Sequence, residues 1–370
     1  MRFRKYLIKL KPQNISIFQF MQKWQYGSWG GVTGKEFLIM NELTYERIIS
    51  LENLLAAWQG FLPGKRGKPD VQEFGFRLMD NLLDLHQELK ERGYRHGDYE
   101  HFKINDPKPR DIHKASVRDR LLHHAVYRVL YPYFDRRFIA DSFSCRLRKG
   151  THKAIKRFHN VGHQVSNNDT RHCYVLKCDI RKFFASIDHQ LLKNILAKSI
   201  SDISTLSLIN NVIDSFSSIR QGVGLPLGNL TSQLLTNIYM NEFDQFVKHG
   251  LKAKYYIRYA DDFVFLSEDR KYLENLIPQI QTFLQDHLKL ELHPGKMFIK
   301  TLSSGVDFLG WVHFSDHRVL RTATKRRMFR HLGVGLPSDE RVQSYLGLLS
   351  HGNTQKLQHR LSLPNRPNSV

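Results

Sequence analysis

The spacing of hydrophobic residues changes along the chain, and each spacing predicts a different kind of element. From about residue 44 onward, apolar residues recur every three or four positions, which is typical of amphipathic helices. Short apolar runs rich in aromatic and β-branched residues predict strands instead. Helices are predicted over about 44–60, 71–92, 117–130, 234–246, 270–288 and 341–360. Strands are predicted at 174–179 and in two hairpins at 102–112 and 255–266. Two further short strands are predicted at 298–300 and 306–312, joined by a turn at 303–305.

Three aspartates lie where predicted strands end. Asp261 and Asp262 separate two apolar arms within residues 255–266, which predicts a β-hairpin with both acids at its tip. Upstream, the apolar strand 174–179 ends on Asp179. Because ionised carboxylates are very unfavourable to bury without a cation, this hairpin tip predicts a metal site. Carboxylates from two strands can hold two divalent ions.

The chain is strongly basic. Its 370 residues include 56 Lys and Arg against 35 Asp and Glu, which gives a net charge of +21 and a pI of about 9.8. Such an excess usually indicates a polyanionic partner, nucleic acid first, and the alternative is an ordinary basic soluble protein. Two basic segments are candidates for contact with a phosphate backbone, or else are solvated charge runs. One contains Arg146, Arg148 and Lys149, and the other contains Lys325, Arg326 and Arg327.

The cysteines and the N-terminus predict a protein of the reducing cytoplasm. Cys145, Cys173 and Cys178 form no Cys-x-x-Cys pair, which argues against a disulfide framework. The basic N-terminus lacks the apolar core of a signal peptide, and no stretch of about 18 uncharged apolar residues occurs. Export and membrane spanning are therefore disfavoured.

The order of these blocks resembles the reverse transcriptases. Their palm motifs are similar to the strand ending on Asp179, the glycine-rich loop 222–233, the hairpin Tyr259–Asp262, the Lys296 segment and the run Phe308–Trp311. The ordered set carries the resemblance, because any one of these short motifs would occur often by chance. It covers about residues 44 to 350, and its fingers block is similar to 102–158.

The resemblance implies an α+β fold arranged as a right-hand polymerase, with fingers, a palm built on an antiparallel sheet and a short helical thumb. No ribonuclease H domain is expected. The implied domains are an N-terminal appendage (1–43), a helical N-terminal region with fingers (44–172), a palm (173–312) with a fingers insertion at about 186–221, a basic helical thumb (313–361) and a tail (362–370).

The resemblance also implies the roles of the acids. Asp179 and Asp261 would bridge two Mg²⁺ ions, for which Mn²⁺ can substitute, with Asp262 as the supporting acid and the Ile180 carbonyl as a further ligand. Phosphoryl transfer depends chiefly on positioning and charge neutralisation, which explains the need for hard oxygen ligands.

Further positions match nucleotide contacts of the family. Lys103 and Arg110 fall where the fingers hold the incoming triphosphate, and the alternative is that one of them contacts only the template. Phe184 matches the aromatic gate that excludes a ribose 2′ hydroxyl; the alternative is a core residue, but on a strand it would face away from Phe183. Lys296 resembles the lysine that closes on the nucleotide. The primer grip is implied at Phe308, Leu309, Gly310 and Trp311.

One loop departs from the common pattern. Most of the family carries Pro-Gln-Gly where this chain has Pro226, Leu227 and Gly228, and Ser-Pro where it has Ser232 and Gln233. Leu227 cannot make the hydrogen bonds that a glutamine makes near the nascent base pair, so base selectivity should weaken. The pattern looks like reverse transcriptases of diversity-generating retroelements, and antiviral-defence reverse transcriptases share parts of it.

The expected function is RNA-directed DNA synthesis on a dedicated structured RNA, with error-prone copying in a diversity-generating retroelement. The first alternative is a defence-associated reverse transcriptase that makes cDNA from a partner noncoding RNA. A non-catalytic RNA-binding scaffold is a minor alternative. The expected partners are template RNA, primer or cDNA, dNTPs, a dedicated noncoding RNA and an accessory protein or a second copy of the chain, with no membrane.

Overall fold

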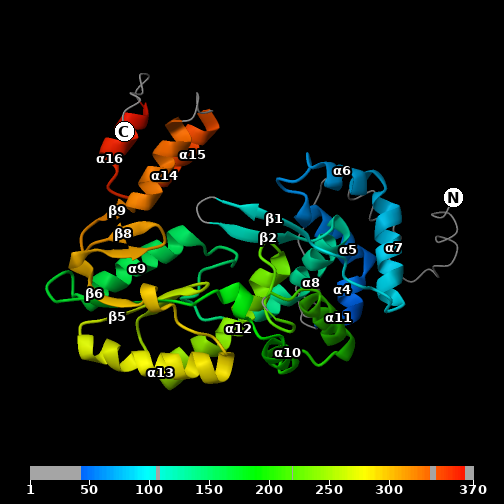
Figure 1. Ribbon diagram of the computed structural model, residues 1–370, viewed down its shortest axis with the longest axis horizontal. Helices are drawn as coiled ribbons and strands as arrows, with labels where there is room; N and C mark the ends of the chain where they lie inside the picture. Colours follow the sequence, from blue (N-terminus) through cyan, green and yellow to red (C-terminus); the bar gives the residue numbers. More distant parts are fainter. Residues whose placement is uncertain (1–42, 106–108, 219, 334–338, 363–370) are drawn as a thin grey trace, which may run out of the picture.

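A computed structural model describes residues 43–105, 109–218, 220–333 and 339–362. The predicted N-terminal appendage and tail lie outside these residues, apart from residues 43 and 362. Figure 1 shows a helical region beside a region of sheets, with the final helices standing above the sheets. The sheets have two, four and three strands, and all their strand pairs are antiparallel. The α+β prediction is therefore confirmed.

Two predicted helices of the helical region are each broken in two. Residues 44–60 form α4 (Tyr45–Ile49) and α5 (Leu51–Phe61), because Ser50 is extended and its Oγ accepts a hydrogen bond from the Asn53 amide at the start of α5. Residues 71–92 form α6 (Pro69–Phe76) and α7 (Leu78–Lys90), which are separated at Arg77. The core helix α8 (Val117–Asp135) follows, extended beyond the predicted 117–130.

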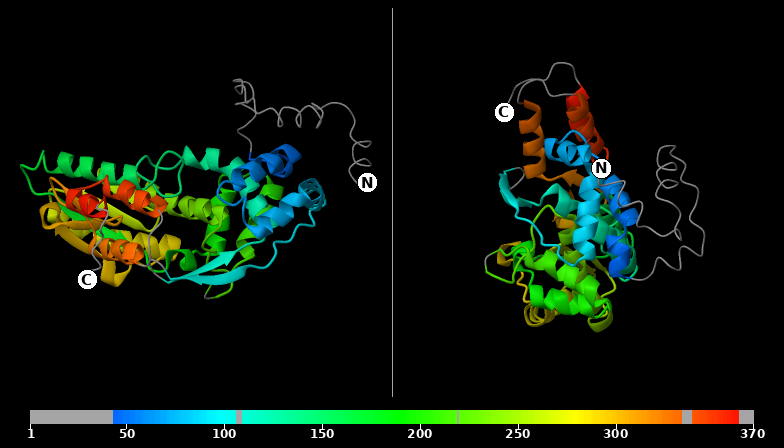
Figure 2. Two further views of the ribbon diagram at one scale, coloured as in Figure 1. Left: turned by 90° about the horizontal axis from the view of Figure 1, so that it is seen from above. Right: turned by 90° about the vertical axis from the view of Figure 1, so that its right-hand side faces the viewer.

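The predicted hairpin at 102–112 is present as β1 (Glu100–Ile104) and β2 (Arg110–Lys114). Figures 1 and 2 show it extending from the helical region toward the sheets. Next along the chain after α8 comes α9 (Thr151–Val165), which lies in the region of the sheets (Figure 1). Further along the chain, α10 (His189–Ala197), α11 (Ile203–Asp214) and α12 (Leu230–Gln245) complete the helical region.

The four-stranded sheet has the order β4-β5-β3-β6, and it is called the palm sheet here because it falls within the predicted palm, 173–312. Its strands are β3 (Tyr174–Asp179), β4 (Tyr256–Tyr259), β5 (Asp262–Ser267) and β6 (Phe298–Thr301). Strands are present at both places predicted within 298–312, but they do not pair with each other, because β6 pairs with β3. The three-stranded sheet is instead formed by β7 (Val306–Phe308), β8 (Trp311–His313) and β9 (Arg318–Leu320).

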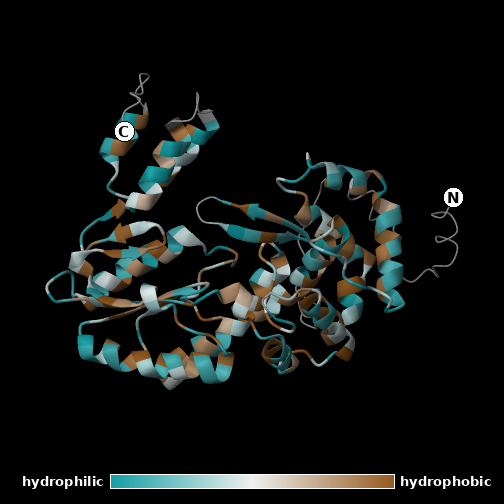
Figure 3. Cartoon of the chain, viewed as in Figure 1, coloured by the Kyte–Doolittle hydropathy of each residue, from teal (hydrophilic) through white to brown (hydrophobic). Residues whose placement is uncertain are grey.

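Both faces of the palm sheet are covered, which explains the nearly continuous apolar runs of its strands. Val175 and Val264 belong to a cluster with residues of α9, whereas Leu176 and Phe263 belong to the main core with α12 and α13 (Arg270–Leu288). Figure 1 shows the sheet between α9 and α13. Because strand residues alternate, Asp179 and Asp262 follow the α9 face. In Figure 3, α13 carries many hydrophilic positions.

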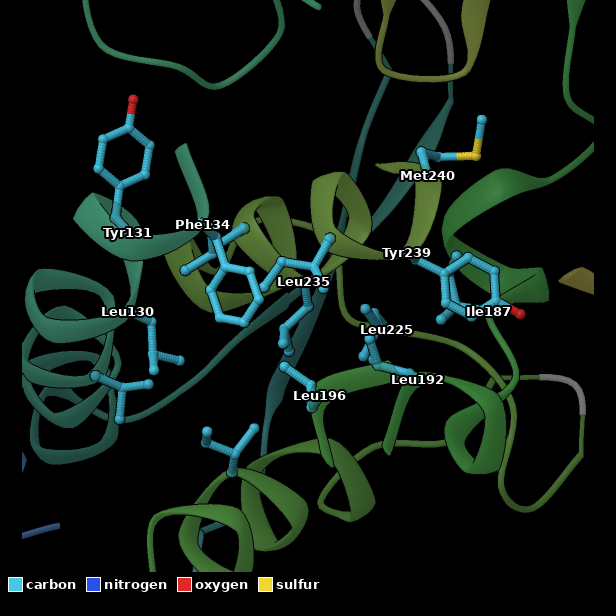
Figure 4. Packing of buried hydrophobic residues seen from close by; sticks show 14 of the residues in the cluster. Leu130, Tyr131, Phe134, Ile187, Leu192, Leu196, Leu225, Leu235, Tyr239 and Met240 are labelled. Carbon is cyan, nitrogen blue, oxygen red and sulfur yellow. The ribbon is translucent and has the colours of Figure 1, made fainter. Parts of the chain in front are cut away.

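The main core continues from the sheet into the helical region. Figure 4 shows Phe134 of α8, Leu235 of α12 and Leu196 of α10 close to one another in this core. This packing fixes the helices of the 186–221 segment to the rest of the helical region.

Beyond the third sheet, the predicted helix at 341–360 is two helices. They are α15 (Asp339–Leu349) and α16 (Gln355–Ser362), preceded by α14 (Thr322–Gly333). Thr354 lies at the break, where its Oγ1 donates to the Leu349 carbonyl. Within the described ranges, no helix is long and apolar enough to cross a membrane.

Candidate active site

Strand pairing brings the three aspartates together. Asp179 ends β3 and Asp262 begins β5, and their Cα atoms are partners in the register of these two strands. Asp261 lies in the turn between β4 and β5, and its carbonyl accepts a hydrogen bond from the Ile180 amide at 3.1 Å. The acids predicted from two separate strands therefore share one end of the palm sheet.

The turn that presents Asp261 has an unusual backbone. Tyr259 pairs with Asp262, so Ala260 and Asp261 form a two-residue turn. Ala260 has a φ of 56°, a region that favours glycine. The Ala260 carbonyl accepts a hydrogen bond from Arg258 Nη1 at 3.1 Å. This contact helps to hold the turn in its strained conformation.

Arg258 was missed as a site residue by the sequence reasoning. Its Nε and Nη2 lie 2.8 and 2.6 Å from the two carboxylate oxygens of Asp244 on α12, and both side chains are 0% exposed. Asn237 accepts from Nη1 at 3.2 Å, and Tyr256 donates its hydroxyl to Asp244 at 2.8 Å. A charged residue inside an otherwise apolar strand was the available signal, because a buried charge requires a partner.

Burial strongly affects the ionisation of the acids. It raises the pKa of Asp262 to about 7, despite the ammonium of Lys177 at 3.1 Å from Oδ2. Burial and the neighbouring charge of Asp179 raise the pKa of Asp261 as well. Asp262 Oδ1 is buried without a hydrogen-bond partner among the described residues. The neighbouring cations therefore do not offset the cost of burying the ionised forms of Asp261 and Asp262.

The residues fit a divalent cation, although they do not form a ready-made cage. Three carboxylates offer hard oxygen donors, and Asp262 Oδ1 has an unused lone pair. In the described part of the chain, no three His, Cys, Asp or Glu side chains already converge as a metal site. Lys296 Nζ instead lies 2.6 Å from Asp179 Oδ1. An ion held by Asp179, Asp261, Asp262 and the Ile180 carbonyl would take the place of this lysine.

The raised pKa of Asp262 predicts that this residue makes the ion-free protein less stable as pH rises. Between the ordinary value of 3.8 and the folded-state pKa of about 7, the folded protein keeps a proton that the unfolded chain has released. The contribution of Asp262 to the free energy of unfolding should therefore fall through this window and level off above it. Denaturant unfolding across the window measures the slope. In Asp262→Asn the slope should be smaller, and an unchanged slope would exclude Asp262 as its source.

The hairpin of β1 and β2, called the fingers hairpin because it falls within the predicted fingers, brings one cation toward the acids. The charge of Arg110, which begins β2, and that of Lys296 act on Asp261 and oppose the rise in its pKa caused mainly by burial. Lys103 pairs with Asp111, whereas Arg110 pairs with Ile104, so regular alternation directs Lys103 and Arg110 to opposite faces of the hairpin. The structure therefore places the charge of Arg110 near Asp261, whereas Lys103 faces the other side of the hairpin.

Comparison with known proteins identifies the family. Residues 103–313, more than half of the 370 residues, match the family Reverse transcriptase (RNA-dependent DNA polymerase). This chain belongs to the reverse transcriptase family. The palm sheet with its terminal acids lies within the matched residues, consistent with the predicted right-hand polymerase fold.

Relatives of this reverse transcriptase include two bacterial proteins. It is 27% identical over 258 residues to Protein YkfC of Escherichia coli (strain K12). That match covers 59% of this chain and 65% of YkfC. It is 24% identical over 295 residues to Group II intron-encoded protein LtrA of Lactococcus lactis subsp. cremoris. That match covers 61% of this chain and 47% of LtrA. The chain therefore spans less than two thirds of the length of either relative.

Similar solved structures include an apo telomerase from Candida tropicalis truncated from its C-terminal domain. That match has a TM-score of 0.46 and 12% identity, and covers 66% of this reverse transcriptase and 60% of the telomerase chain. A partial Cas6-RT-Cas1–Cas2 complex matches with a TM-score of 0.40 and 20% identity, covering 65% of this chain and 42% of the other.

In this reverse transcriptase, the glycine-rich loop lies against the fingers hairpin. The Leu227 carbonyl accepts a hydrogen bond from the His113 amide at 3.3 Å. Gly228 has a φ of 107°, and a Cβ there would lie 3.3 Å from the side chain of Ile112. Half-buried Leu227 therefore lies beside β2, the strand that begins with Arg110.

The placement of Phe184 on a strand was wrong. β3 ends at Asp179, and Phe183–Ser186 form the 3₁₀ helix η1 after Lys182, which has a φ of 46°. Phe183 is buried in the core, whereas Phe184 is only half-buried. The Phe184 carbonyl accepts a hydrogen bond from the Leu225 amide at 2.8 Å. A tight helical turn, rather than strand alternation, separates the two rings.

If Phe184 acts as the gate, Phe184→Ala should weaken the preference for dNTPs over rNTPs by about 10- to 200-fold, the range for a change in an apolar specificity contact. The measurement is the ratio of kcat/KM for dCTP to that for CTP. Phe184→Tyr keeps the ring and should preserve the ratio. Lower stability in Phe184→Ala with an unchanged ratio would show that the ring only packs against the core.

The structure corrects three of the predicted nucleic-acid contacts. The side chain of Arg146 is 6% exposed, and it binds Asp135 and the carbonyls of Ile139 and Ser142, so it holds its own loop together. Phe308 and Trp311 are 0% and 1% exposed, so their side chains cannot contact a primer. These predictions failed because a sequence does not show which cations and aromatics are used internally.

The remaining predicted nucleic-acid contacts include residues that are exposed or half-buried. Leu309 and Gly310, with φ of 53° and 87°, form the turn between β7 and β8, so a primer contact there would involve the turn itself. Arg148 is exposed, whereas Lys149 donates to the Ala140 carbonyl at 2.7 Å. On α14, Lys325 and Arg326 are exposed and Arg327 is half-buried.

Proposed function

We propose that this protein is an RNA-directed DNA polymerase. The observation that carries the proposal is the meeting of Asp179, Asp261 and Asp262 at one end of the palm sheet, within the residues matched to the family. In this reaction the 3′ oxygen of the primer attacks the α-phosphorus of a dNTP, and pyrophosphate leaves. The proposed substrates are therefore dNTPs on an RNA template with a primer.

The roles of the side chains follow from their charges and positions. Asp179, Asp261 and Asp262, with the Ile180 carbonyl, would hold two Mg²⁺ ions, or Mn²⁺ as a substitute. Bound ions would neutralise charge on the attacking and leaving oxygens. Lys296, now 2.6 Å from Asp179 Oδ1, would turn toward the triphosphate when an ion takes its place. Arg110 and Lys103 would hold the triphosphate from the fingers side.

The polymerase proposal is tested with purified protein, a primed RNA, dNTPs and Mg²⁺. DNA extension should require the RNA, the primer and the divalent ion. RNA binding without any incorporation, with Mg²⁺ or Mn²⁺, would support the scaffold alternative and contradict the polymerase proposal.

We further propose that the biological role is error-prone copying of a dedicated structured RNA in a diversity-generating retroelement. Leu227 supports this role, because its carbonyl contacts β2 while its apolar side chain offers no hydrogen bond to a base pair. The dedicated noncoding RNA would be accompanied by an accessory protein or a second copy of this chain. The proposed location is the cytoplasm.

Sequencing the RNA and DNA that copurify with the protein from its host separates the roles. Errors concentrated at template adenines would support diversity generation. Repetitive, homopolymeric or protein-primed DNA would contradict it and favour antiviral defence.

A variant tests the loop itself. Leu227→Gln restores a side chain that can donate and accept hydrogen bonds, and should lower the error rate by about tenfold, the effect of about one good hydrogen bond. Leu227→Met is the matched control, because it keeps an apolar side chain of similar size and should leave the error rate unchanged. Equal error rates in both variants would remove Leu227 as the cause.

A further inference from the structure

Lys177 joins two sheets that share no strand pairing in the described chain. It lies on β3, and its ammonium is 3.1 Å from Asp262 Oδ2 in the palm sheet. The same ammonium donates a hydrogen bond to the backbone carbonyl of Asp307, on β7 of the third sheet, at 3.0 Å. The Lys177 side chain is 13% exposed, so little water competes for these contacts.

Asp307 extends this connection to the thumb. Its Oδ2 lies 3.0 Å from Nε of Arg321, the residue immediately before α14. The Arg321 carbonyl accepts a hydrogen bond from the Lys325 amide at 2.9 Å, which joins Arg321 to the first turn of α14. Asp262, Lys177, Asp307 and Arg321 therefore form a continuous chain of contacts from the acids to the first thumb helix.

The contacts in this chain differ in burial: the Lys177 and Asp262 side chains are mostly buried, whereas the Asp307 and Arg321 side chains are 37% and 41% exposed. Asp307 Oδ1 is buried and has no partner within the described ranges, so the contact of Oδ2 with Arg321 is important for holding this carboxylate. Lys177 in turn supplies positive charge to Asp262, whose pKa is raised mainly by burial. The contacts of Lys177 lie in a low dielectric and are therefore strong, whereas solvent weakens the ion pair between Asp307 and Arg321. Residues joined in one such network are coupled, so breaking one contact affects its neighbours.

We propose that Lys177 is a positioning residue that couples the orientation of α14 to the carboxylate of Asp262. The inference rests on the proposed polymerase function, because the coupling would let nucleic acid on the thumb align the acids. A shift of α14 would move β7 through Arg321 and Asp307, and the Lys177 ammonium would carry that shift to Asp262. The role assigned to Lys177 and Arg321 is to act through these contacts rather than on the reacting atoms.

A double-mutant cycle tests the coupling. Arg321→Met, Lys177→Met and the double variant are compared with the original protein. The first readout is hydrogen exchange of the amides at 259–262, without ion, nucleotide or nucleic acid. Each single variant should speed this exchange by about tenfold, and the double variant should be no faster than Lys177→Met alone. Asp307→Asn keeps the carbonyl for Lys177 but weakens the ion pair, so it should reproduce Arg321→Met.

Kinetics give the second readout. Arg321→Met should lower kcat by about tenfold while KM for the primed template changes less than about twofold. Lys356→Met, which removes a thumb cation of α16 outside the chain of contacts, should change neither kcat nor exchange at the turn. An effect of Arg321→Met on KM alone would show a simple nucleic-acid contact and overturn the proposal.

The exchange result decides the coupling even if the protein makes no DNA. Unchanged exchange at 259–262 in Arg321→Met would overturn the inference, as would an equal effect of Arg321→Met with and without Lys177. Absence of synthesis by the original protein would count against the polymerase proposal alone, because the exchange experiment uses no substrate.

Discussion

Replacement of Asp261 by asparagine is expected to abolish DNA synthesis and leave the fold intact. Asparagine keeps the size of the side chain but removes the charge needed to hold a divalent ion. Because such ions contribute several kcal/mol to transition-state stabilisation, synthesis should fall by at least about a thousandfold, equivalent to about 4 kcal/mol. Extension of a primed RNA by the purified variant measures the loss.

The same change should not weaken the ion-free protein. Burial, followed by the charge of Asp179, raises the pKa of Asp261, so the fold disfavours the ionised form that asparagine removes. Thermal unfolding without divalent ions should therefore occur at the same temperature as in the original protein or a higher one.

A matched control separates charge at the site from charge elsewhere. Asp286 lies exposed on α13, and Asp286→Asn should leave synthesis unchanged. Synthesis by Asp261→Asn within about tenfold of the original rate would contradict a metal role for this acid and favour an RNA-binding scaffold.

The local patterns of the sequence predicted the elements that carry the acids. Alternation and apolar composition placed Asp179 at the end of a strand and Asp261 at the turn of a hairpin, and both placements are confirmed. Helix α13 begins and ends at the predicted residues, 270 and 288, and Asp269 caps its start. These features depend on neighbours in sequence, so the sequence alone could specify them.

Predictions that depended on contacts between residues far apart in sequence were less accurate. Residues 298–312 contain two apolar segments, but β6 pairs with β3, which lies more than one hundred positions away. Arg146 looked available for a phosphate until Asp135 and two carbonyls were found to bind it. The sequence also did not predict breaks inside helices, such as the one at Ser50, because the new helix that starts there keeps the same spacing of apolar residues.

The contacts that position the acids come from remote parts of the chain. Arg258 reaches Asp244 on α12, Lys177 reaches Asp307, and Lys296 reaches Asp179. The identities of these residues were visible in the sequence, but their pairing was not. A charge inside an apolar strand signals that a partner exists without saying where it lies.

The buried pair of Arg258 and Asp244 leads to the second large effect. Asp244→Asn keeps the shape of the side chain but leaves the guanidinium of Arg258, 0% exposed, without its counter-charge. Breaking a buried pair in this way is expected to lower the free energy of unfolding by about 3–5 kcal/mol. Denaturant unfolding measures the change. Glu274→Gln, in the exposed pair with Arg270, is the control and should change stability by less than about 1 kcal/mol.

A double variant then separates stability from support of the turn. Arg258→Met with Asp244→Leu replaces the pair by apolar groups of similar size, which often restores stability after a buried pair is removed. Arg258→Met also removes the donor to the Ala260 carbonyl, now at 3.1 Å, so the turn that presents Asp261 loses a support. The double variant should therefore be more stable than Asp244→Asn and still synthesise DNA poorly. Recovery of both properties would show that Arg258 stabilises the fold without positioning the acids.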